Sequence, residues 1–350
     1  MPIPWNSQAN LPNGSMTRGN TMTRTTMTRR RVLTGAAGIT LAASFGTGVR
    51  AQTAWPDKPV RVVVPYAPGG GADTLSRLLF AKLQEDLGQS FIIDNRAGGG
   101  GTIGPAIVAK SPADGYTILF DATGFSVNPG LLPSLPFDPA ADFIPVFLAG
   151  QTPNLLVTHP SNEQKTVADI IASSKASADG FSWASAGNGS VQHLAFEMFK
   201  SQTGAKLTHI PFKGGGPATK DVMGNHVKFL FANAAGATTH VKNGLLRAIA
   251  HTGTGRLASL PDVPSVAETL PGFEALDWNG AFLPASTPQA IVDKLNAALN
   301  AAIKQPAVLE RTGQLSIQTK ANTPAEFAAF VKAETEKWTK IIKAGNIQAE

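Results

Sequence analysis

Residues 65–73 read Pro-Tyr-Ala-Pro-Gly-Gly-Gly-Ala-Asp, and this stretch decides the fold of the chain. Before it, residues 60–64 form a β-branched run that is typical of a buried parallel strand. After it, leucines recur at helical spacing over 75–87, and Gly88 stands where a helix would end. Asp73 is a good N-cap residue, so we expect it to cap this helix. A strand, a glycine loop and a helix in this order present free backbone N–H groups at a positive helix end, which predicts an anion site.

The first 51 residues have the pattern of an export signal. Residues 28–33 form a twin-arginine pattern, a moderately apolar run rich in Gly and Ala follows, and Val49-Arg50-Ala51 is similar to a cleavage site. The apolar run is too short and too rich in Gly and Thr for a transmembrane helix. We therefore expect residues 1–51 to be a twin-arginine signal peptide with an N-terminal extension, cleaved near Ala51, and the mature protein to be periplasmic.

The basic charge of the chain belongs to this N-terminal segment. The 350 residues carry 30 Lys and Arg against 24 Asp and Glu, a formal net charge of +6. The first 51 residues hold six arginines and no acidic residue, so 24 basic and 24 acidic residues remain in the rest. Without a net positive charge the mature chain lacks the attraction that nucleic acids require, so we expect no nucleic-acid partner. The absence of cysteine excludes disulfides, thiolate metal sites and a cysteine nucleophile.

Strand and helix patterns alternate after the first strand. Beyond the leucine-rich helix, the sequence predicts a strand at 91–94, then a helix over 103–109 behind the glycine run 98–101, then a strand at 117–120. This order predicts a parallel sheet with right-handed crossovers, and ligands of such sheets bind outside the carboxyl ends of the strands. Three segments follow those strand ends, namely 66–73, 95–102 and 121–126.

Two apolar segments are expected to connect this unit to a second one. Residues 129–145 are rich in Pro and predict a loop, and the apolar strands at 146–150 and 155–157 are separated by Thr-Pro-Asn. We take this region as the first crossing into a second domain. Residues 273–284 are apolar again and are expected to cross back.

The segment between the crossings repeats the pattern of the opening stretch. Residues 166–174 predict a helix with a capping-box-like start. A strand at 181–185 leads into Ala-Gly-Asn-Gly-Ser at 186–190 and then into a helix whose apolar residues fall on one face. Further strands are predicted at 207–211, 227–231 and 246–251, with a helix over 218–224.

Two C-terminal helices are expected to return and cover the first sheet. One starts at Thr287, and the other follows the capping box Thr-Pro-Ala-Glu at 323–326. The first domain would then comprise residues 52–152 plus 277–350, and the second would comprise 153–276. The predicted fold is α/β with two domains, each a mainly parallel sheet flanked by helices, and two connections between them make a hinge.

The motifs of the chain resemble those of the Bug family, the periplasmic substrate-binding proteins of tripartite tricarboxylate transporters. They occur in the order of that family over residues 55–345. The matching stretches are 56–59, 65–73, 94–101, 112–117, 184–190, 260–264 and 323–327. The resemblance implies a type II-like periplasmic binding protein, a Venus flytrap that closes on a small carboxylate held by backbone N–H groups and bridging waters. It also implies a membrane permease as partner.

The resemblance implies a set of ligand-binding positions in both domains. In the first domain they are Tyr66, Ala67, Gly70, Gly71, Asp73 and Thr123, and in the second Asn154, Ser185, Gly187, Asn188, Gly189 and Asn233. Here Tyr66 replaces a common Phe, and Ala232 replaces the aspartate that usually precedes Asn233. Asp73 has three interpretations: an N-cap, a partner of an ammonium group on an amino-acid ligand, or a repulsive contact for a second carboxylate.

Two catalytic alternatives are weaker. The glycines Gly99, Gly101 and Gly104 match a dinucleotide fingerprint, which suggests an exported NAD(P)-binding oxidoreductase with Asp121 at the next strand end. However, four residues separate the preceding strand from this motif, where a tight turn is needed. Residues 185–187 are a near miss to a nucleophile elbow, because Trp183 stands where a glycine is required.

The histidines of the chain do not indicate catalysis either. His193 and Glu197 share one helix face without a third metal ligand nearby, so an exposed or capping pair is expected. The sequence therefore predicts a monomeric binding protein that is not an enzyme. We expect its ligand to be a di- or tricarboxylate, an aromatic acid or an amino acid, and we expect no metal and no cofactor.

Overall fold

The computed structural model describes residues 55–212 and 214–349, which belong to one compact unit. The predicted signal peptide and its cleavage site at Ala51 lie outside the described residues. No helix in the described part of the chain is long and apolar enough to cross a membrane.

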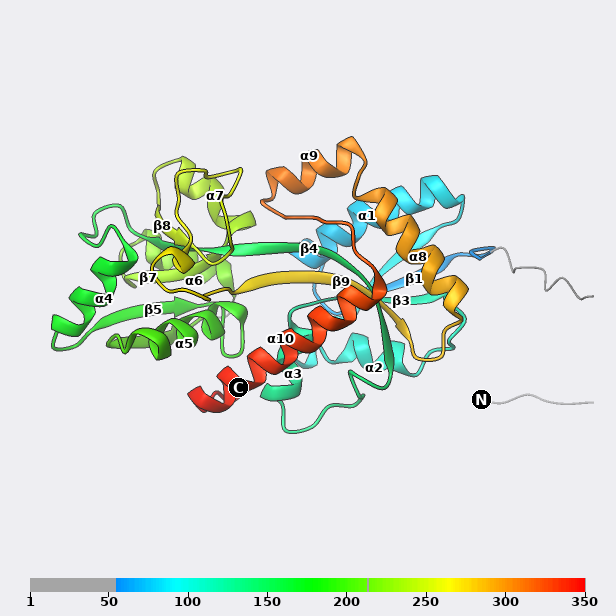
Figure 1. The fold of residues 1–350 in the computed structure, drawn as a ribbon, viewed down its shortest axis with the longest axis horizontal. Helices are drawn as coiled ribbons and strands as arrows, with labels where there is room; N and C mark the ends of the chain where they lie inside the picture. The colour runs from blue at the N-terminus through cyan, green and yellow to red at the C-terminus, as the bar shows by residue number, and fades with distance from the viewer. Residues whose placement is uncertain (1–54, 213, 350) are drawn as a thin grey trace, which may run out of the picture. The chain divides into compact units, whose positions relative to one another are not determined.

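The first sheet is built on the predicted βαβαβ unit. Strand β1 (Val60–Val64) pairs in parallel with β2 (Phe91–Asn95) and β3 (Thr117–Ala122), as predicted. Strand β9 (Leu276–Pro284) joins β3 in the antiparallel sense and pairs on its other side with β4 (Phe143–Thr158). The order is β2-β1-β3-β9-β4 (Figure 1).

Helix α1 (Gly71–Leu87) follows the opening stretch and ends at Gly88, whose φ of 67° confirms the predicted helix end. The prediction that Asp73 is the N-cap is wrong, because Gly70 takes that position. Asp73 is the third residue of the helix and is buried, and its carboxylate accepts a hydrogen bond of 2.9 Å from the Gly69 backbone N–H. A hydrogen bond from Arg77 lowers the pKa of Asp73 to about 2, so this carboxylate fixes the loop to the helix.

Alternate side chains of β1 enter two separate cores, because successive residues of a strand point to opposite faces. Val60, Val62 and Val64 pack against α1 and α8 (Gln289–Ala302), with α9 (Pro306–Gln314) beside them. Val63 faces the other way, toward α2 (Ile103–Ala109) and α3 (Gly124–Leu131). The short 3₁₀ turn η1 (Gly99–Gly101) precedes α2.

The second sheet has the order β4-β7-β5-β6, with β8 also paired to β4. Its strands are β5 (Phe181–Ser185), β6 (Leu207–Pro211), β7 (Phe229–Asn233) and β8 (Arg247–His251). The pairs of β5 with β6 and β7 are parallel, and those of β4 are antiparallel. In both sheets the antiparallel pairs therefore involve β4 or β9, the strands that cross between them.

Helices pack on both faces of the second sheet. Trp183 lies in the core formed with α4 (Val167–Ala176) and α5 (Val191–Thr203), while the adjacent Ala184 faces α6 (Gly215–Met223) and α7 (Ala234–Lys242). The predicted capping box of α4 is confirmed: the Thr166 side chain accepts from the Asp169 N–H. Helix α7 lies where the sequence predicted no helix.

The first crossing differs from its prediction. Residues 152–154 do not interrupt a strand, because β4 runs without a break through Thr152-Pro153-Asn154. Its first part pairs with β9 and its last part with β7 and β8, so one strand serves both sheets. The predicted loop at 129–145 is also partly wrong, since Pro129 lies inside α3 and β4 already begins at Phe143.

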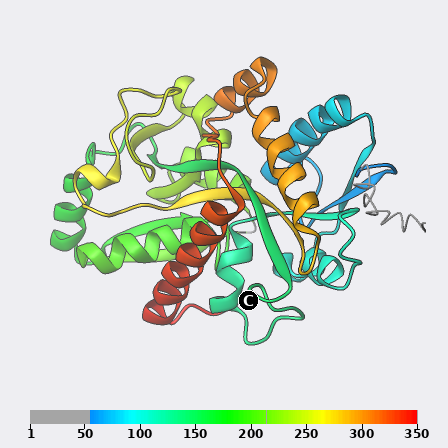
Figure 2. The same cartoon turned by 45° about the vertical axis from the view of Figure 1, so that its right-hand side comes forward.

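Helix α10 (Pro324–Gly345) packs against both sheets (Figure 2). Its capping box is confirmed, because the Thr323 side chain accepts from the Glu326 N–H and Glu326 accepts from the Thr323 N–H. Phe327 contributes to the core under the first sheet, whereas Trp338 and Ile342 lie in the core of the second. The expectation that this helix covers the first sheet alone is therefore corrected.

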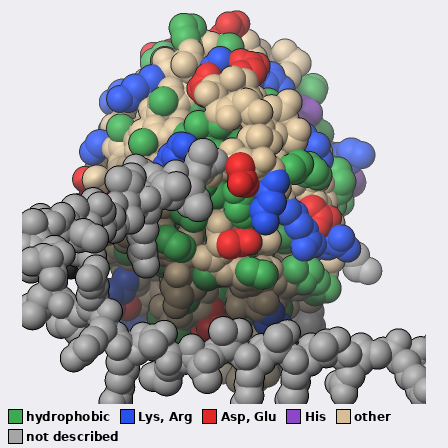
Figure 3. All heavy atoms as spheres, turned by 90° about the vertical axis from the view of Figure 1, so that its right-hand side faces the viewer, with side chains coloured by type: hydrophobic (Ala, Val, Ile, Leu, Met, Phe, Trp, Pro, Cys, Tyr) green, Lys and Arg blue, Asp and Glu red, His purple; other side chains and the backbone are tan. Residues whose placement is uncertain are grey.

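The surface around β1 carries charges of both signs. Arg61 and Arg96 both contact Asp94, and Lys58 lies 3.9 Å from Asp114. Figure 3 shows acidic and basic side chains mixed on this end of the molecule, without one dominant sign. The mixture agrees with the zero net charge derived for the chain after residue 51.

Candidate binding cleft

A cavity of about 700 Å³ lies where the elements of the two sheets meet. Its wall on the first-sheet side comes from Tyr66, from the start of α1 and from residues 277–279 of β9. On the other side it is formed by the start of α6, the end of β7 and the first residues of α7. A volume of this size suits a small organic molecule.

Two helices at the cavity wall begin in glycine, and no described side chain caps either of them. They are α1, which starts at Gly71, and α6, which starts at Gly215. The first backbone N–H groups of a helix have no partner within the helix. In α4 and α10, which do not line the cavity, threonine side chains cap these groups. At α1 and α6 no described side chain caps these groups, and the positive helix ends favour an anion.

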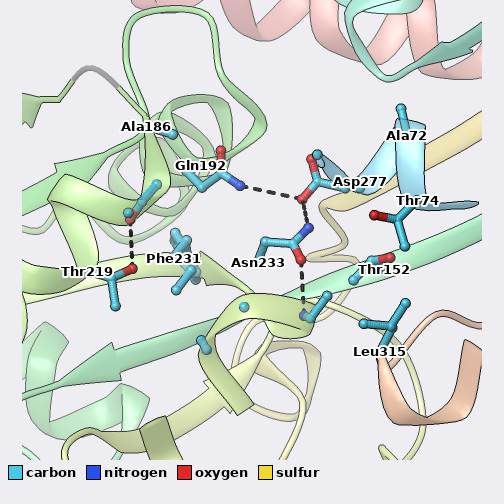
Figure 4. A pocket seen from close by; sticks show the side chains of 18 of the residues that line it. Ala72, Thr74, Thr152, Ala186, Gln192, Thr219, Phe231, Asn233, Asp277 and Leu315 are labelled. Atoms are coloured by element: carbon cyan, nitrogen blue, oxygen red, sulfur yellow. Dashed lines mark hydrogen bonds between the residues drawn. The ribbon is translucent and has the colours of Figure 1, made fainter. Parts of the chain in front are cut away.

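Polar side chains meet at the base of the cavity (Figure 4). Asn233 donates a hydrogen bond of 2.8 Å from Nδ2 to Asp277 Oδ2, and Gln192 Nε2 lies 3.4 Å from the same oxygen. The other end of the Asn233 amide caps α7 by accepting from the Ala235 N–H. Burial raises the pKa of Asp277 to about 6, against hydrogen bonding that lowers it.

A second acid lies behind Tyr66. The Tyr66 hydroxyl donates a hydrogen bond of 2.9 Å to Asp121 Oδ1, and the Ala122 N–H donates to the same oxygen at 2.7 Å. Asp121 Oδ2 is buried and has no hydrogen-bond partner among residues 55–212 and 214–349. Burial raises the pKa of Asp121 to about 7, and burial together with the Asp121 carboxyl raises that of Tyr66. The Tyr66 ring is therefore held at the cavity wall by a buried acid.

The buried Asp121 makes a testable contribution to stability. Its pKa is about 7 in the folded state and about 3.9 in an unfolded chain. The folded state holds the Asp121 proton more tightly than the unfolded chain does. The contribution of this group to the free energy of unfolding is therefore complete below about pH 4, and it is lost as the pH rises through 7. Between pH 5 and pH 8 we expect the wild type to lose about 2 kcal/mol more than Asp121→Asn. Urea unfolding at several pH values measures this difference, and parallel pH profiles for the two proteins would contradict it.

Four of the twelve predicted ligand-binding residues line the cavity, namely Tyr66, Gly70, Gly71 and Asn233. Others lie just behind the wall. Thr123 is buried and its hydroxyl accepts from the Trp278 N–H at 2.8 Å, while Asn154 is buried and accepts from Gln192 at 2.9 Å. Asp73 holds the loop to α1 as described above, and the exposed Ala67 is not among the lining residues.

The glycine loop after β5 faces away from the cavity except at Ala186. The Gly187 N–H donates to the Ser185 hydroxyl at 3.1 Å, and the Gly187 φ of 122° explains the glycine at this position. A side chain at Gly189 would collide with Leu131 of α3. Asn188 lies at a different, shallower pocket beside the C-terminal end of α10. Of the five residues 186–190, the cavity wall contains one.

The catalytic alternatives meet specific obstacles in the structure. Ser185 lies 2.6 Å from His209 Nε2, but the serine is fully buried and is not part of the cavity wall. In the dinucleotide alternative, the Asp121 carboxyl would bind a ribose, but it is buried against Tyr66. A side chain at Gly104 would collide with Pro65, so this glycine permits close packing of α2 on the sheet.

The His193–Glu197 pair is a packing feature. His193 Nε2 lies 3.7 Å from the Glu197 carboxylate, and its Nδ1 accepts from the Gly189 N–H. The ring is buried and stacks on His209 with the ring centroids 3.8 Å apart, so the exposed alternative is wrong for His193. The helix itself is capped by Ser190, and His193 instead fixes the loop residue before that cap. Within 55–212 and 214–349, no group of three His, Asp or Glu side chains is placed to hold a metal ion.

Several cavity residues escaped the sequence analysis. Asp277 and Gln192 were not singled out, and neither were Gly215 and Gly216 at the start of α6. Two signals were present: an acid, Asp277, in the middle of the mostly apolar stretch 273–284, which also holds Glu274, and a third strand–glycine–helix pattern before α6.

The model of the tripartite tricarboxylate transporter family receptor matches residues 75–347. The protein belongs to this family. The protein BugT of Bordetella pertussis is 35% identical over 310 residues, covering 87% of this chain and 95% of BugT. A solved Rhodopseudomonas palustris protein with adipate is 33% identical with a TM-score of 0.75, covering 84% of this chain and 99% of that one. MatC from Rhodopseudomonas palustris, solved with bound malate, is 31% identical with a TM-score of 0.70, and the match covers 82% of this chain and 100% of MatC.

These comparisons confirm the resemblance to the Bug family and the periplasmic binding protein fold predicted from the sequence. Receptors of the tripartite tricarboxylate family are binding proteins, so the family does not support the oxidoreductase alternative. The structure adds the positions of this chain's own residues in the cleft.

Proposed function

We propose that this receptor captures a small organic carboxylate in the cleft and does not transform it. The observation that carries the proposal is the pair of uncapped glycine starts, α1 from the first sheet and α6 from the second, at one cavity wall. Each offers backbone N–H groups to a carboxylate oxygen, and each helix end is positive. A ligand that contacts both helices would draw the two sides of the cleft together.

The ligands of two relatives support this class of compound. The two Rhodopseudomonas palustris proteins were solved with adipate and with malate, which are both dicarboxylates. We assign to this chain a di- or tricarboxylate, an aromatic acid or an amino acid, with Tyr66, Gly70, Gly71 and Asn233 as contacts. The loop after β5 would then be shaped by Ser185, Gly187, Asn188 and Gly189. Thr123 would position Trp278, and Asn154 would position Gln192.

The remaining parts of the proposal concern transport. Residues 52–152 with 277–350 would form one domain and 153–276 the other, and β4 and β9 would flex between them as the cleft closes. The protein would act as a monomer in the periplasm after twin-arginine export. It would deliver its ligand to a permease of the tripartite tricarboxylate type.

A thermal-shift screen of the purified mature protein tests the proposal. A carboxylate at 100 times its Kd stabilises the folded state by about 2.7 kcal/mol, which raises the Tm by several degrees. We expect such a shift with at least one class of organic acid and none with NAD(P). A shift with NAD(P) and with no organic acid would overturn the assignment.

A further inference from the structure

One acidic side chain faces the cleft of a receptor for anions. Among the described residues that line the cavity, Asp277 is the only carboxylate, and Lys220 and His240 are the only basic side chains. Figure 4 shows Asp277 on the side of Ala72 and Thr74 of α1, with Ala186 and Thr219 across the cavity. A ligand in this cavity therefore shares it with one carboxylate.

Asp277 is held by amide hydrogen bonds and keeps part of its surface at the cavity. Asn233 and Gln192 both donate to Oδ2. Asn154 is a third amide that hydrogen-bonds this carboxylate. An ionised carboxylate has roughly four acceptor positions, so capacity for a ligand group remains. An ionised carboxylate only accepts hydrogen bonds, so its natural complement is an ammonium group or another strong donor.

The surroundings of Asp277 make a simple dianion a poor ligand. A second ligand carboxylate near Oδ1 would face a like charge in a partly dehydrated site, which is repulsive. An ammonium group at the same place would pair with the Asp277 carboxylate and offset the energetic cost of burying its charge. The uncapped α1 and α6 starts remain available for the carboxylate end of the same molecule.

We propose that Asp277 makes this receptor selective for carboxylates that carry an amino group, with the ammonium on Asp277 and the carboxylate on the uncapped helix starts. This inference rests on the proposed function, because it names the ligand class within the same cleft. The inference explains why an acidic residue stands at this position of β9, since forming the strand does not require one.

A purely structural role of Asp277 predicts a different experimental result. Asparagine at position 277 keeps an oxygen that can accept from both Asn233 and Gln192, so Asp277→Asn retains the network while removing the charge. If Asp277 served only to hold those two side chains, this variant would bind the same ligands with the same preference.

The experiment uses matched pairs that differ by one amino group. Aspartate and succinate, 2-aminoadipate and adipate, and phenylalanine and 3-phenylpropanoate are titrated by calorimetry at pH 8 into wild type and Asp277→Asn. Asp262→Asn, an exposed loop position, is the matched control. We expect wild type and the control to bind the amino member of a pair at least tenfold more tightly. Asp277→Asn should lose 10- to 100-fold in affinity for that member and bind its deamino partner as well or better.

The outcomes separate this inference from the proposed function. If wild type binds the deamino members equally well or better, the inference fails and the carboxylate receptor stands. The same holds if Asp277→Asn keeps the wild-type preference. If no member of the panel or of a wider set of organic acids binds, the proposed function fails and the inference falls with it. If the variant is unstable, the wild-type comparison within each pair still tests the inference, because equal binding of the two members overturns it.

Discussion

The variant Gly71→Asp is expected to bind carboxylates about 100-fold more weakly than wild type while folding normally. Gly71 is the first residue of α1 and lines the cavity. A Cβ at this position meets no atom of the described residues within 4 Å, so the side chain fits. An acid in the first turn stabilises a helix by about 0.3–1 kcal/mol. The same charge would lie next to a ligand carboxylate, and two like charges about 4 Å apart repel by roughly 4 kcal/mol near a protein surface.

The control is Gly71→Asn, which has almost the same shape and no charge. We expect it to retain most of the affinity, so the difference between the two variants isolates the charge. Gly216→Asp places the same charge in the first turn of α6, again without a steric clash, and should weaken binding similarly. Calorimetric titration and Tm measurements report affinity and stability separately. Wild-type affinity in both Asp variants would show that the ligand does not contact these helix starts.

The elements of the first sheet were predictable because their signals are local. The run of valines in β1, the leucine spacing of α1 and Gly88 at its end each depend on a few neighbouring residues. The capping boxes of α4 and α10 are equally local, and both were predicted correctly. In these cases the propensity of the segment and the packing of the fold favour the same structure.

The errors arose where tertiary packing overrides a local signal. Pro129 is tolerated in α3, although proline normally disfavours a helix interior, because its neighbours Phe125 and Val127 are buried in the two cores. Thr-Pro-Asn at 152–154 resembles a turn, yet both sheets pair with β4 on either side and keep it extended. The sequence of these residues alone does not show which strands will pair with them.

In the candidate site, too, the local signals were predictable and the tertiary arrangement was not. The sequence indicated that glycine loops before helices bind anions, but it does not show which helix starts face a common cavity. The α5 start was chosen, and the structure places α6 there instead, with only Ala186 and Gln192 contributed from around α5. Asp277 is brought to Asn233 by the pairing of β4 with β7 and β9, which are distant in sequence.

The variant Gly280→Ala is expected to lose about 3 kcal/mol of stability, because it overpacks a closed site. Gly280 lies on β9 and pairs on one side with Asp121 and on the other with Leu148. A Cβ at Gly280 would lie 2.2 Å from Phe327 Cζ and 3.0 Å from the Phe147 carbonyl oxygen. The added methyl group therefore meets a buried ring on one side and backbone on the other. For a chain of this size the Tm should fall by roughly 5–10 °C.

Two further variants separate a steric cause from a general sensitivity to alanine. Gly313→Ala in α9 meets no atom within 4 Å, so it should leave stability unchanged or raise it by up to about 1 kcal/mol. Phe327→Leu shortens the ring that blocks position 280, and alone it should be destabilising because Phe327 is fully buried among aromatic rings. Combined with Gly280→Ala it should recover part of the loss, giving a double-mutant interaction energy of about 1 kcal/mol or more in urea unfolding. Simple addition of the two losses would mean that the Phe327 ring is not what excludes a side chain at this position.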